Sequence, residues 1–247
     1  RKYHDLKNVE FGEATLKDIG IDAQIINGDA LSKTGAITIV ANHPGGADVL
    51  ATFTVVGRYR PDNVILANRI ICIEPIKDMV IPVDTMAKTK VDINEVDQAY
   101  KDGKVIIFYA AGKNSRYNEK GELRDRRWRT TFLEMAEKYN TPIHVMKIEG
   151  GNSPLFYKVS KFRERNKWLK NVPLENLFQL REIMEAKGVL KFFVSNPVFF
   201  PKTAKKATKQ ELRSKADRLY DFIYAMDDKN LDFEEYEASA KSKANNN

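Results

Sequence analysis

The sequence is nearly free of cysteine and has no long hydrophobic run. Its 247 residues include one cysteine, Cys72, so an internal disulfide and a cysteine-rich zinc site are both excluded. A chain with so little cysteine is typical of a reducing compartment. The apolar runs, such as Val105 to Ala111, have the length of a buried strand and fall short of the roughly 20 residues that cross a bilayer.

The charged residues leave a positive surplus. Lysine and arginine number 41 against 34 acidic residues, which gives a net charge of +7, and 43% of the chain is apolar and can form a sizeable core. This balance excludes an acidic disordered segment and favours anionic partners, namely phospholipid headgroups, phosphorylated cofactors or nucleic acid. Because no helix-turn-helix, RNP or zinc pattern is present, nucleic acid is not expected as a partner.

Strand-like and helix-like stretches alternate along the chain. Apolar and β-branched runs predict strands, and amphipathic or charged stretches predict helices. The strands are expected at 36–41, 64–67, 80–83, 105–109, 142–148 and 189–194, and the helices at 47–56, 93–102, 128–139, 174–187 and 208–226. The polar residues 114–126 predict a loop. This alternation predicts an α/β fold with a mixed, mostly parallel sheet flanked by helices.

The same pattern predicts a single domain over residues 1–228, which includes a basic helix at its carboxyl end. No internal repeat and no convincing linker interrupts this range. Residues 229–247 contain few apolar side chains, so they are expected to form a flexible tail.

The motif Asn-His-Pro-Gly-Gly-Ala-Asp at residues 42–48 carries the strongest chemical signal. On a regular helix, His43 and Asp48 would point about 140° apart and could not meet. Proline at position 44, however, favours an extended backbone at His43, and the two glycines that follow permit a tight turn. The motif therefore predicts that His43 ends a strand and that Asp48 faces back towards it from the first turn of the next helix.

A pair arranged in this way can act as a general base. Asp48 would accept a hydrogen bond from one imidazole nitrogen of His43, which leaves the other nitrogen able to take a proton from a substrate hydroxyl. The geometry corresponds to two members of a serine-protease triad, with the substrate supplying the nucleophile. Taken alone, this spacing is more often a turn histidine followed by an ordinary acid at a helix start.

Several sequence blocks, taken in order, resemble the PlsC-like glycerolipid acyltransferases. Residues 42–48 resemble the first motif of that family, and Phe108-Tyr-Ala-Ala-Gly-Lys-Asn-Ser-Arg116 resembles its anion-binding motif. The second block is most similar to the Phe-Pro-Ala-Gly-Glu-x-Ser-Arg form of the hemolysin-like branch, which acylates lyso-ornithine and lyso-glycine lipids. Further blocks of that branch stand in the expected order at Ala67–Arg69, Ile81–Asp84, Asp125–Phe132 and Pro142–Ser153. The resemblance implies a PlsC-like acyltransferase fold.

The resemblance also implies roles for individual residues. His43 becomes the general base and Asp48 the residue that orients it, whereas Lys113, Ser115 and Arg116 fall on positions that bind the acceptor or a phosphate. The residues implied to line a substrate channel are Asn42, Gly45, Gly46 and Pro142. Lys113 replaces the glutamate of the family motif, and an ammonium group attracts phosphate or carboxylate where a carboxylate would suit a hydroxyl or an amine.

The activity that the resemblance implies is transfer of a fatty acyl group to a hydroxyl of a lyso-lipid. The donor would be an acyl thioester, carried on acyl carrier protein or coenzyme A, and neither a metal nor a redox cofactor is required. The alternative is a non-catalytic protein on the same fold that binds lipid or acyl carrier protein, its activity lost or altered through Lys113.

A peripheral membrane location is expected, on the cytoplasmic face of the inner membrane. Arg127, Trp128 and Arg129 belong to a cluster of four arginines. This cluster either forms a face that meets lipid headgroups, or is a solvated helix start whose tryptophan is anchored in the core. Each basic side chain of residues 202–218 could add about 1 kcal/mol of binding near an anionic bilayer, but soluble helices are often as strongly charged, and that interpretation is slightly favoured. The basic stretch at 158–170 also suggests a peripheral membrane face.

Overall fold

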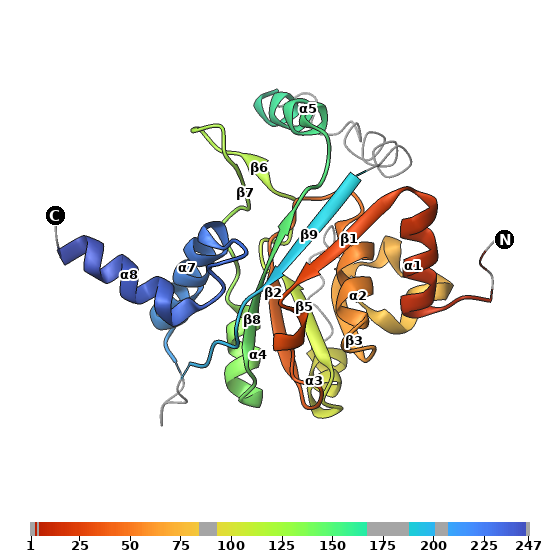
Figure 1. The fold of residues 1–247 in the computed structure, drawn as a ribbon, viewed down its shortest axis with the longest axis horizontal. Helices are drawn as coiled ribbons and strands as arrows, with labels where there is room; N and C mark the ends of the chain where they lie inside the picture. Colours follow the sequence, from red (N-terminus) through yellow and green to blue (C-terminus); the bar gives the residue numbers. More distant parts are fainter. Residues whose placement is uncertain (1–2, 4, 84–92, 167–187, 201–206, 246–247) are drawn as a thin grey trace.

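The structure is a computed structural model that describes residues 3, 5–83, 93–166, 188–200 and 207–245 (Figure 1). A seven-stranded sheet forms its centre. The strands are β1 (Ile21–Ile26), β2 (Ile37–Ala41), β3 (Asn63–Asn68), β4 (Val80–Val83), β5 (Val105–Tyr109), β8 (Ile143–Glu149) and β9 (Gly188–Val194). Their order is β1-β9-β8-β2-β5-β3-β4, and all neighbours run parallel except β8 and β9. The predicted mixed, mostly parallel sheet is confirmed.

Helices cover both faces of this sheet (Figure 1). They are α1 (Asn8–Asp18), α2 (Asp48–Gly57), α3 (Ile93–Lys101), α4 (Thr131–Tyr139) and α7 (Lys209–Ala225). Helices α1 and α2 share one core layer, and α3, α4 and α7 share the other. Successive residues of β2 alternate between them, so that Ile39 lies in the first layer and Val40 in the second. Burial on both faces explains why the central strands are unbroken apolar runs.

The carboxyl ends of three central strands meet at one edge of the sheet. Ala41 of β2 is in register with Tyr109 of β5 on one side and with Met146 of β8 on the other. Helix α2 follows β2 on one face, whereas α4 packs on the other face after β5. In open α/β sheets, ligand crevices form where the helices that follow two neighbouring strands lie on opposite faces of the sheet. The loops that follow these strands are therefore the ones placed to build a site.

Two connecting segments differ from the sequence-based expectation. Residues 114–126, predicted as a loop, contain a hairpin of β6 (Arg116–Tyr117) and β7 (Leu123–Arg124). The helix predicted over 128–139 begins at Thr131, as α4. The helix predicted over 174–187 lies outside the described residues.

The carboxyl-terminal segment differs most. The sequence predicts a flexible tail over 229–247, whereas the structure forms helix α8 over Phe233–Asn245. Phe233 is 5% exposed, and its ring lies 5.4 Å from that of Phe222 on α7. An ion pair between Arg218 of α7 and Glu237 of α8 adds a polar contact. The prediction of a flexible tail was wrong because it rested on the low apolar content, and a few anchored aromatic side chains are sufficient to hold this helix.

Replacing Phe233 with alanine is expected to lower the free energy of unfolding by about 3 kcal/mol, because the change removes a buried aromatic side chain. The measurement is the midpoint and slope of urea denaturation. The matched control, Glu235→Ala, changes an exposed residue of the same helix and should shift stability by less than about 0.5 kcal/mol. Equal stability of both variants and the wild type would show that α8 does not pack on α7.

Candidate active site

The motif at residues 42–48 leaves the sheet at the carboxyl end of β2. The side chain of buried Asn42 pairs with the backbone of Ile148 on β8. Its Nδ2 donates to the carbonyl oxygen at 3.0 Å, and its Oδ1 accepts from the N–H at 2.7 Å. This contact fixes the chain at the point where it turns away from the sheet. Asn42, predicted to line a substrate channel, therefore has both polar side-chain atoms engaged with β8.

A tight turn follows, and it requires glycine. Gly45 and Gly46 have φ angles of +101° and +73°, which residues with a side chain rarely adopt. A Cβ atom at position 45 would also lie 2.4 Å from Nδ2 of Asn152. The turn brings Asp48, the first residue of α2, back towards the strand, and the N–H of Gly45 donates to its Oδ2 at 2.7 Å. The two predicted channel glycines thus shape the loop that carries the acid.

His43 and Asp48 form a close pair. Nδ1 of His43 lies 2.7 Å from Oδ2 of Asp48; the carboxylate is fully buried, while the imidazole is 16% exposed. A carboxylate only accepts hydrogen bonds, so we infer that the neutral imidazole carries its proton on Nδ1 and presents a lone pair at Nε2. No hydrogen bond from a described residue reaches Nε2. The structure thus brings together the two residues that the motif predicted to meet.

The surroundings raise the pKa of His43 above its ordinary value of 6.5. Burial by itself lowers this pKa, because it penalises the charged imidazolium, but the charge and the hydrogen bond of Asp48 outweigh that effect. The carboxylate of Asp125 also raises the pKa, whereas the guanidinium of Arg116 lowers it. The imidazole is therefore a stronger base than that of a free histidine, and it is suited to remove a proton from a hydroxyl group.

Tyr109, at the carboxyl end of β5, holds the imidazole in place. Its ring stacks on that of His43, with centroids 4.3 Å apart and planes inclined by 22°. Its hydroxyl lies 2.8 Å from Oγ1 of Thr52 on α2. Burial raises the pKa of the Tyr109 hydroxyl well above its ordinary value, so the phenol stays neutral beside the base. The sequence assigned no role to this residue, although the pairing of two parallel strands places it next to the motif.

Asp125 is a second buried carboxylate in the site, and the sequence analysis missed it. Its Oδ1 accepts from the backbone N–H of His43 at 3.1 Å and from Oγ of Ser115 at 2.6 Å. Its Oδ2 accepts from Nε1 of Trp128 at 2.9 Å. One carboxylate thus ties together the loop after β2, the loop after β5 and the segment before α4. Burial raises the pKa of Asp125, and these three donors act against the rise.

Helix α7 holds Asp125 from the other side. The backbone N–H of Asp125 donates to the hydroxyl oxygen of Tyr224 at 2.6 Å, and the hydroxyl of Tyr220 donates to its carbonyl oxygen at 2.6 Å. The stretch around Asp125 resembles a family block, but its four arginines suggested a surface rather than a buried acid. The only sequence signal for this role was an acid and a tryptophan three residues apart.

The three predicted anion-binding residues lie in different surroundings. Ser115 is buried, its hydroxyl is bonded to Asp125, and its N–H donates to the carbonyl oxygen of His43 at 2.7 Å. It therefore braces the loop that carries the base. Arg116 is half-buried, and its guanidinium lies 5.7 Å from the ring centre of Phe156. Lys113 is exposed. Nη1 of Arg116 donates to the carbonyl oxygens of Asn114 and Ser115 at 3.3 and 3.0 Å, so Lys113 is the more accessible of the two cations.

The predicted membrane face at residues 127–129 needs correction. Trp128 is 1% exposed and donates its indole N–H to Asp125, so it is part of the core and cannot reach lipid. Arg127 is exposed but pairs with Asp217 of α7 at 3.1 Å. Arg129 is exposed beside the loop that contains Lys113. A buried acceptor for the indole N–H explains why this tryptophan turns inward.

Pro142 also lies away from the position expected of it. It immediately precedes β8, and its carbonyl oxygen accepts from the N–H of Thr38 at 3.0 Å. Thr38 is near the amino end of β2, five residues before His43, which corresponds to roughly 16 Å along a strand. Pro142 is therefore at the opposite edge of the sheet and does not line a channel beside the base.

Within the described residues, no group of three or more histidine, cysteine, aspartate or glutamate side chains is placed to hold a metal ion. None of the described helices combines the length and the apolar character that crossing a membrane requires.

Two curated relatives share part of this sequence. They are the lyso-glycine lipid O-acyltransferases of Phocaeicola vulgatus and Bacteroides thetaiotaomicron, which are 27% identical over 163 residues and 26% identical over 160 residues. Each alignment covers 63% of this chain, and the chain spans 58% of the length of each relative.

A solved structure shows the same fold. The crystal structure of the 1-acyl-sn-glycerophosphate acyltransferase PlsC from Thermotoga maritima superposes with a TM-score of 0.56 at 15% identity, covering 86% of this chain and 74% of that one. The sequence model of the acyltransferase family matches residues 1–216, which is far more than half of the chain. The family resemblance of the sequence blocks is thereby confirmed: this chain belongs to the acyltransferase family.

Proposed function

We propose that this chain transfers a fatty acyl group from an acyl thioester to a hydroxyl of a lyso-lipid. The observation that carries the proposal is the 2.7 Å contact between His43 and the fully buried Asp48, which orients a base at the carboxyl edge of the sheet. The names of the curated relatives support a lyso-lipid acceptor and formation of an ester. Acyl carrier protein or coenzyme A would carry the acyl group.

The chemical step needs one base and its orienting acid. Nε2 of His43 takes the proton of the acceptor hydroxyl as the oxygen attacks the thioester carbonyl carbon, and the new carbon–oxygen bond forms. Asp48 stabilises the imidazolium that results. Collapse of the tetrahedral intermediate breaks the carbon–sulfur bond. The leaving thiolate then accepts from His43 the proton that came from the acceptor hydroxyl. The products are an ester and a free thiol, and the step invokes no metal or redox cofactor.

Two cations are proposed to bind anionic groups of the substrates. Arg116 is held beside the base by its packing against Phe156, and Lys113 is exposed in the same loop. A guanidinium suits a phosphate or a carboxylate, and an ammonium group adds a mobile positive charge. These groups occur on coenzyme A, on the arm of acyl carrier protein and on many lipid headgroups. We propose that the enzyme works as a peripheral protein on the cytoplasmic face of the inner membrane.

His43→Ala is expected to abolish the acceptor-dependent release of free thiol from the acyl thioester of acyl carrier protein or coenzyme A, because the base is lost. Asp48→Asn keeps the shape of the pair but removes the charge, so kcat should fall by about two to four orders of magnitude. The measurement is thiol release with a panel of lyso-lipids, and thermal unfolding checks that each variant folds. If the folded wild type binds lipid but releases no thiol with any acceptor, the non-catalytic alternative replaces the proposal.

The pH profile tests the electrostatic part of the proposal. The base must be neutral to act, so kcat/KM should rise with pH through a pKa above 6.5. In Asp125→Asn the negative charge near the imidazole is removed, which lowers the pKa of His43 and moves this rise to lower pH. The kcat should also fall, since the backbone of His43 loses its charged acceptor, while KM for the acceptor changes little.

Trp128→Phe is the matched control for that variant. It removes one of the three hydrogen bonds to Asp125 but keeps the charge, so the pH at which activity rises should stay in place. An unchanged pH profile and an unchanged kcat in Asp125→Asn would contradict the positioning role of Asp125.

A further inference from the structure

Helix α5 (Pro154–Arg165) buries one side against the active-site loops. Phe156 and Tyr157 are buried, and the ring of Tyr157 lies 5.6 Å from that of Tyr117 on β6. The hydroxyl of Tyr157 donates to the carbonyl oxygen of Pro44 at 2.7 Å. The helix is therefore attached to the turn that follows His43, one residue away from the base.

The other side of α5 exposes large apolar groups. Leu155 is 57% exposed and Phe162 is 60% exposed, and the partly exposed Val159 lies between them at helical spacing. Val189, at the start of β9, is also exposed, and its carbonyl oxygen would lie 3.1 Å from a Cβ atom at Gly150, four residues before α5. The apolar groups of the helix itself, Leu155, Val159 and Phe162, form what we call the α5 surface. An apolar surface of this kind indicates an interaction partner.

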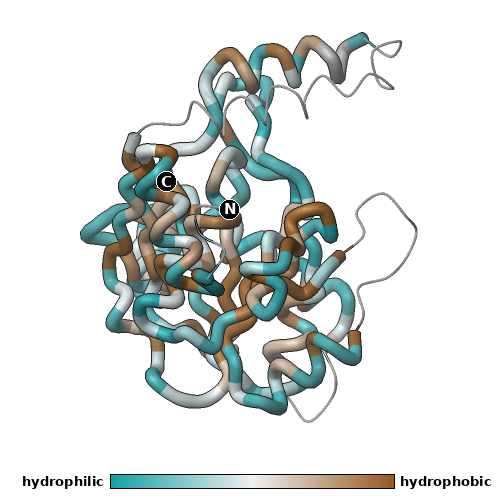
Figure 2. The backbone as a smooth tube through the Cα atoms, turned by 90° about the vertical axis from the view of Figure 1, so that its right-hand side faces the viewer, coloured by the Kyte–Doolittle hydropathy of each residue, from teal (hydrophilic) through white to brown (hydrophobic). Residues whose placement is uncertain are grey.

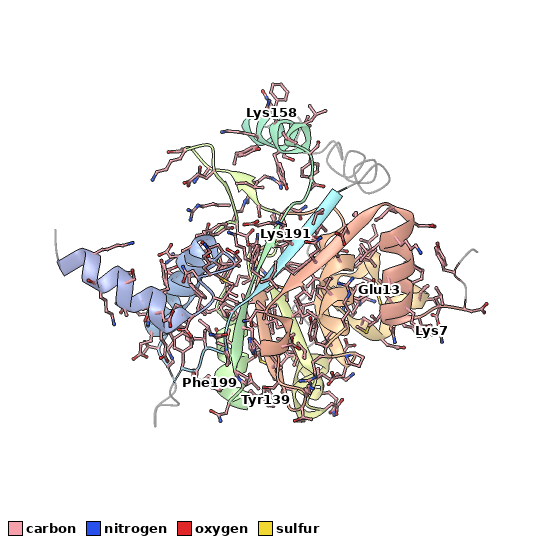
Figure 3. All side chains as sticks on the ribbon, viewed as in Figure 1. Lys7, Glu13, Tyr139, Lys158, Lys191 and Phe199 are labelled. Carbon is pink, nitrogen blue, oxygen red and sulfur yellow. The ribbon has the colours of Figure 1, made fainter. Side chains whose placement is uncertain are left out.

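The α5 surface occupies one end of the molecule. Figure 2 shows α5 at that end, with hydrophobic and hydrophilic residues interspersed along it. In Figure 3, Lys158 on α5 lies at the opposite end of the view from Phe199, which is another exposed apolar residue. The end that carries α5 is the carboxyl edge of β8, where His43 lies.

The exposed side of α5 also carries a basic side chain. Lys158 is exposed between Leu155 and Phe162, and Lys191 is exposed on β9 (Figure 3). No described acidic residue forms an ion pair with either lysine. An apolar stripe flanked by lysines is typical of helices that lie in the interface of an anionic bilayer. A symmetric contact between two copies of the same surface would instead bring like charges together.

We propose that the α5 surface docks on an anionic phospholipid bilayer, with Leu155 and Phe162 inserted among the acyl chains and Lys158 at the headgroups. Because Tyr157 ties α5 to Pro44, docking would place the turn after His43 at the bilayer surface, where a lyso-lipid acceptor resides. The reason for such docking rests on the proposed function, whereas the binding itself does not. This surface replaces the one that the sequence predicted at residues 127–129.

The test is co-sedimentation with vesicles of equimolar phosphatidylglycerol and phosphatidylcholine. The double variant Leu155→Ser/Phe162→Ser should bind about tenfold more weakly or worse, since two large apolar groups no longer enter the bilayer. Lys158→Glu should weaken binding to these vesicles. Phe199→Ser, which changes an equally exposed apolar residue at the opposite end, is the matched control and should bind like the wild type.

The proposal would be overturned by a wild type that does not sediment with these vesicles, by a double variant that binds like the wild type, or by an equal loss in Phe199→Ser. A wild-type dimer that the double variant loses in analytical ultracentrifugation would assign the surface to a second copy instead and would also overturn it. Turnover with a detergent-dispersed acceptor should be unchanged in the double variant. A protein that docks through α5 but releases no thiol would support the docking surface and contradict only the proposed function.

Discussion

The buried carboxylate of Asp48 governs the geometry of this edge of the sheet. A charge that is removed from water must be met by hydrogen-bond donors or by opposite charge. Asp48 Oδ2 is met by the N–H of Gly45 and by Nδ1 of His43, and the residue begins α2, whose amino end favours a negative charge. Because both donors lie within five residues of the acid, the chain has to turn sharply, and glycine permits that turn. The same contacts that satisfy the carboxylate fix the tautomer of the base.

A second buried carboxylate connects this loop to the rest of the molecule. Asp125 binds the backbone of His43 through one oxygen and Trp128 through the other, while two tyrosines of α7 hold its backbone. The position of the base therefore depends on α7, a helix more than 160 residues further along the chain. Buried polar networks of this kind define one arrangement, because any alternative leaves a charged group unpaired. Fold and reactivity are thus linked through two aspartates.

Local signals explain why part of the site could be predicted from the sequence. The turn at residues 42–48 is encoded by proline and glycine within seven residues, so the meeting of His43 and Asp48 followed from backbone preferences. The alternation of strands and helices likewise indicated the sheet. Pro142 begins a predicted parallel strand, and strand direction alone places it at the opposite edge from the carboxyl end of β2. The role expected of Pro142 rested on the motif resemblance, which carries no information about the direction in which the strand runs.

Tertiary contacts explain what the sequence did not reveal. Asp125 lies 82 residues from His43, and in the sequence it is surrounded by arginines that suggest solvent exposure. For Trp128 the same arginines left a surface position and a core position equally open, and the buried acceptor of its indole N–H decides for the core. Helix α8 was missed because the prediction used the average apolar content of the tail, which is low even though Phe233 is buried. Asp125 therefore depends on partners distant in sequence, whereas Trp128 binds an acid three residues away and Phe233 packs on Phe222 of the preceding helix. Composition identifies none of these contacts.

The most direct test of this account is a nitrogen-15 NMR titration of His43 in the folded protein. We expect a neutral ring that carries its proton on Nδ1, with Nε2 titrating at a pKa above 6.5. A neutral ring protonated on Nε2, or a pKa below 6.5, would contradict the claim that Asp48 orients and strengthens the base.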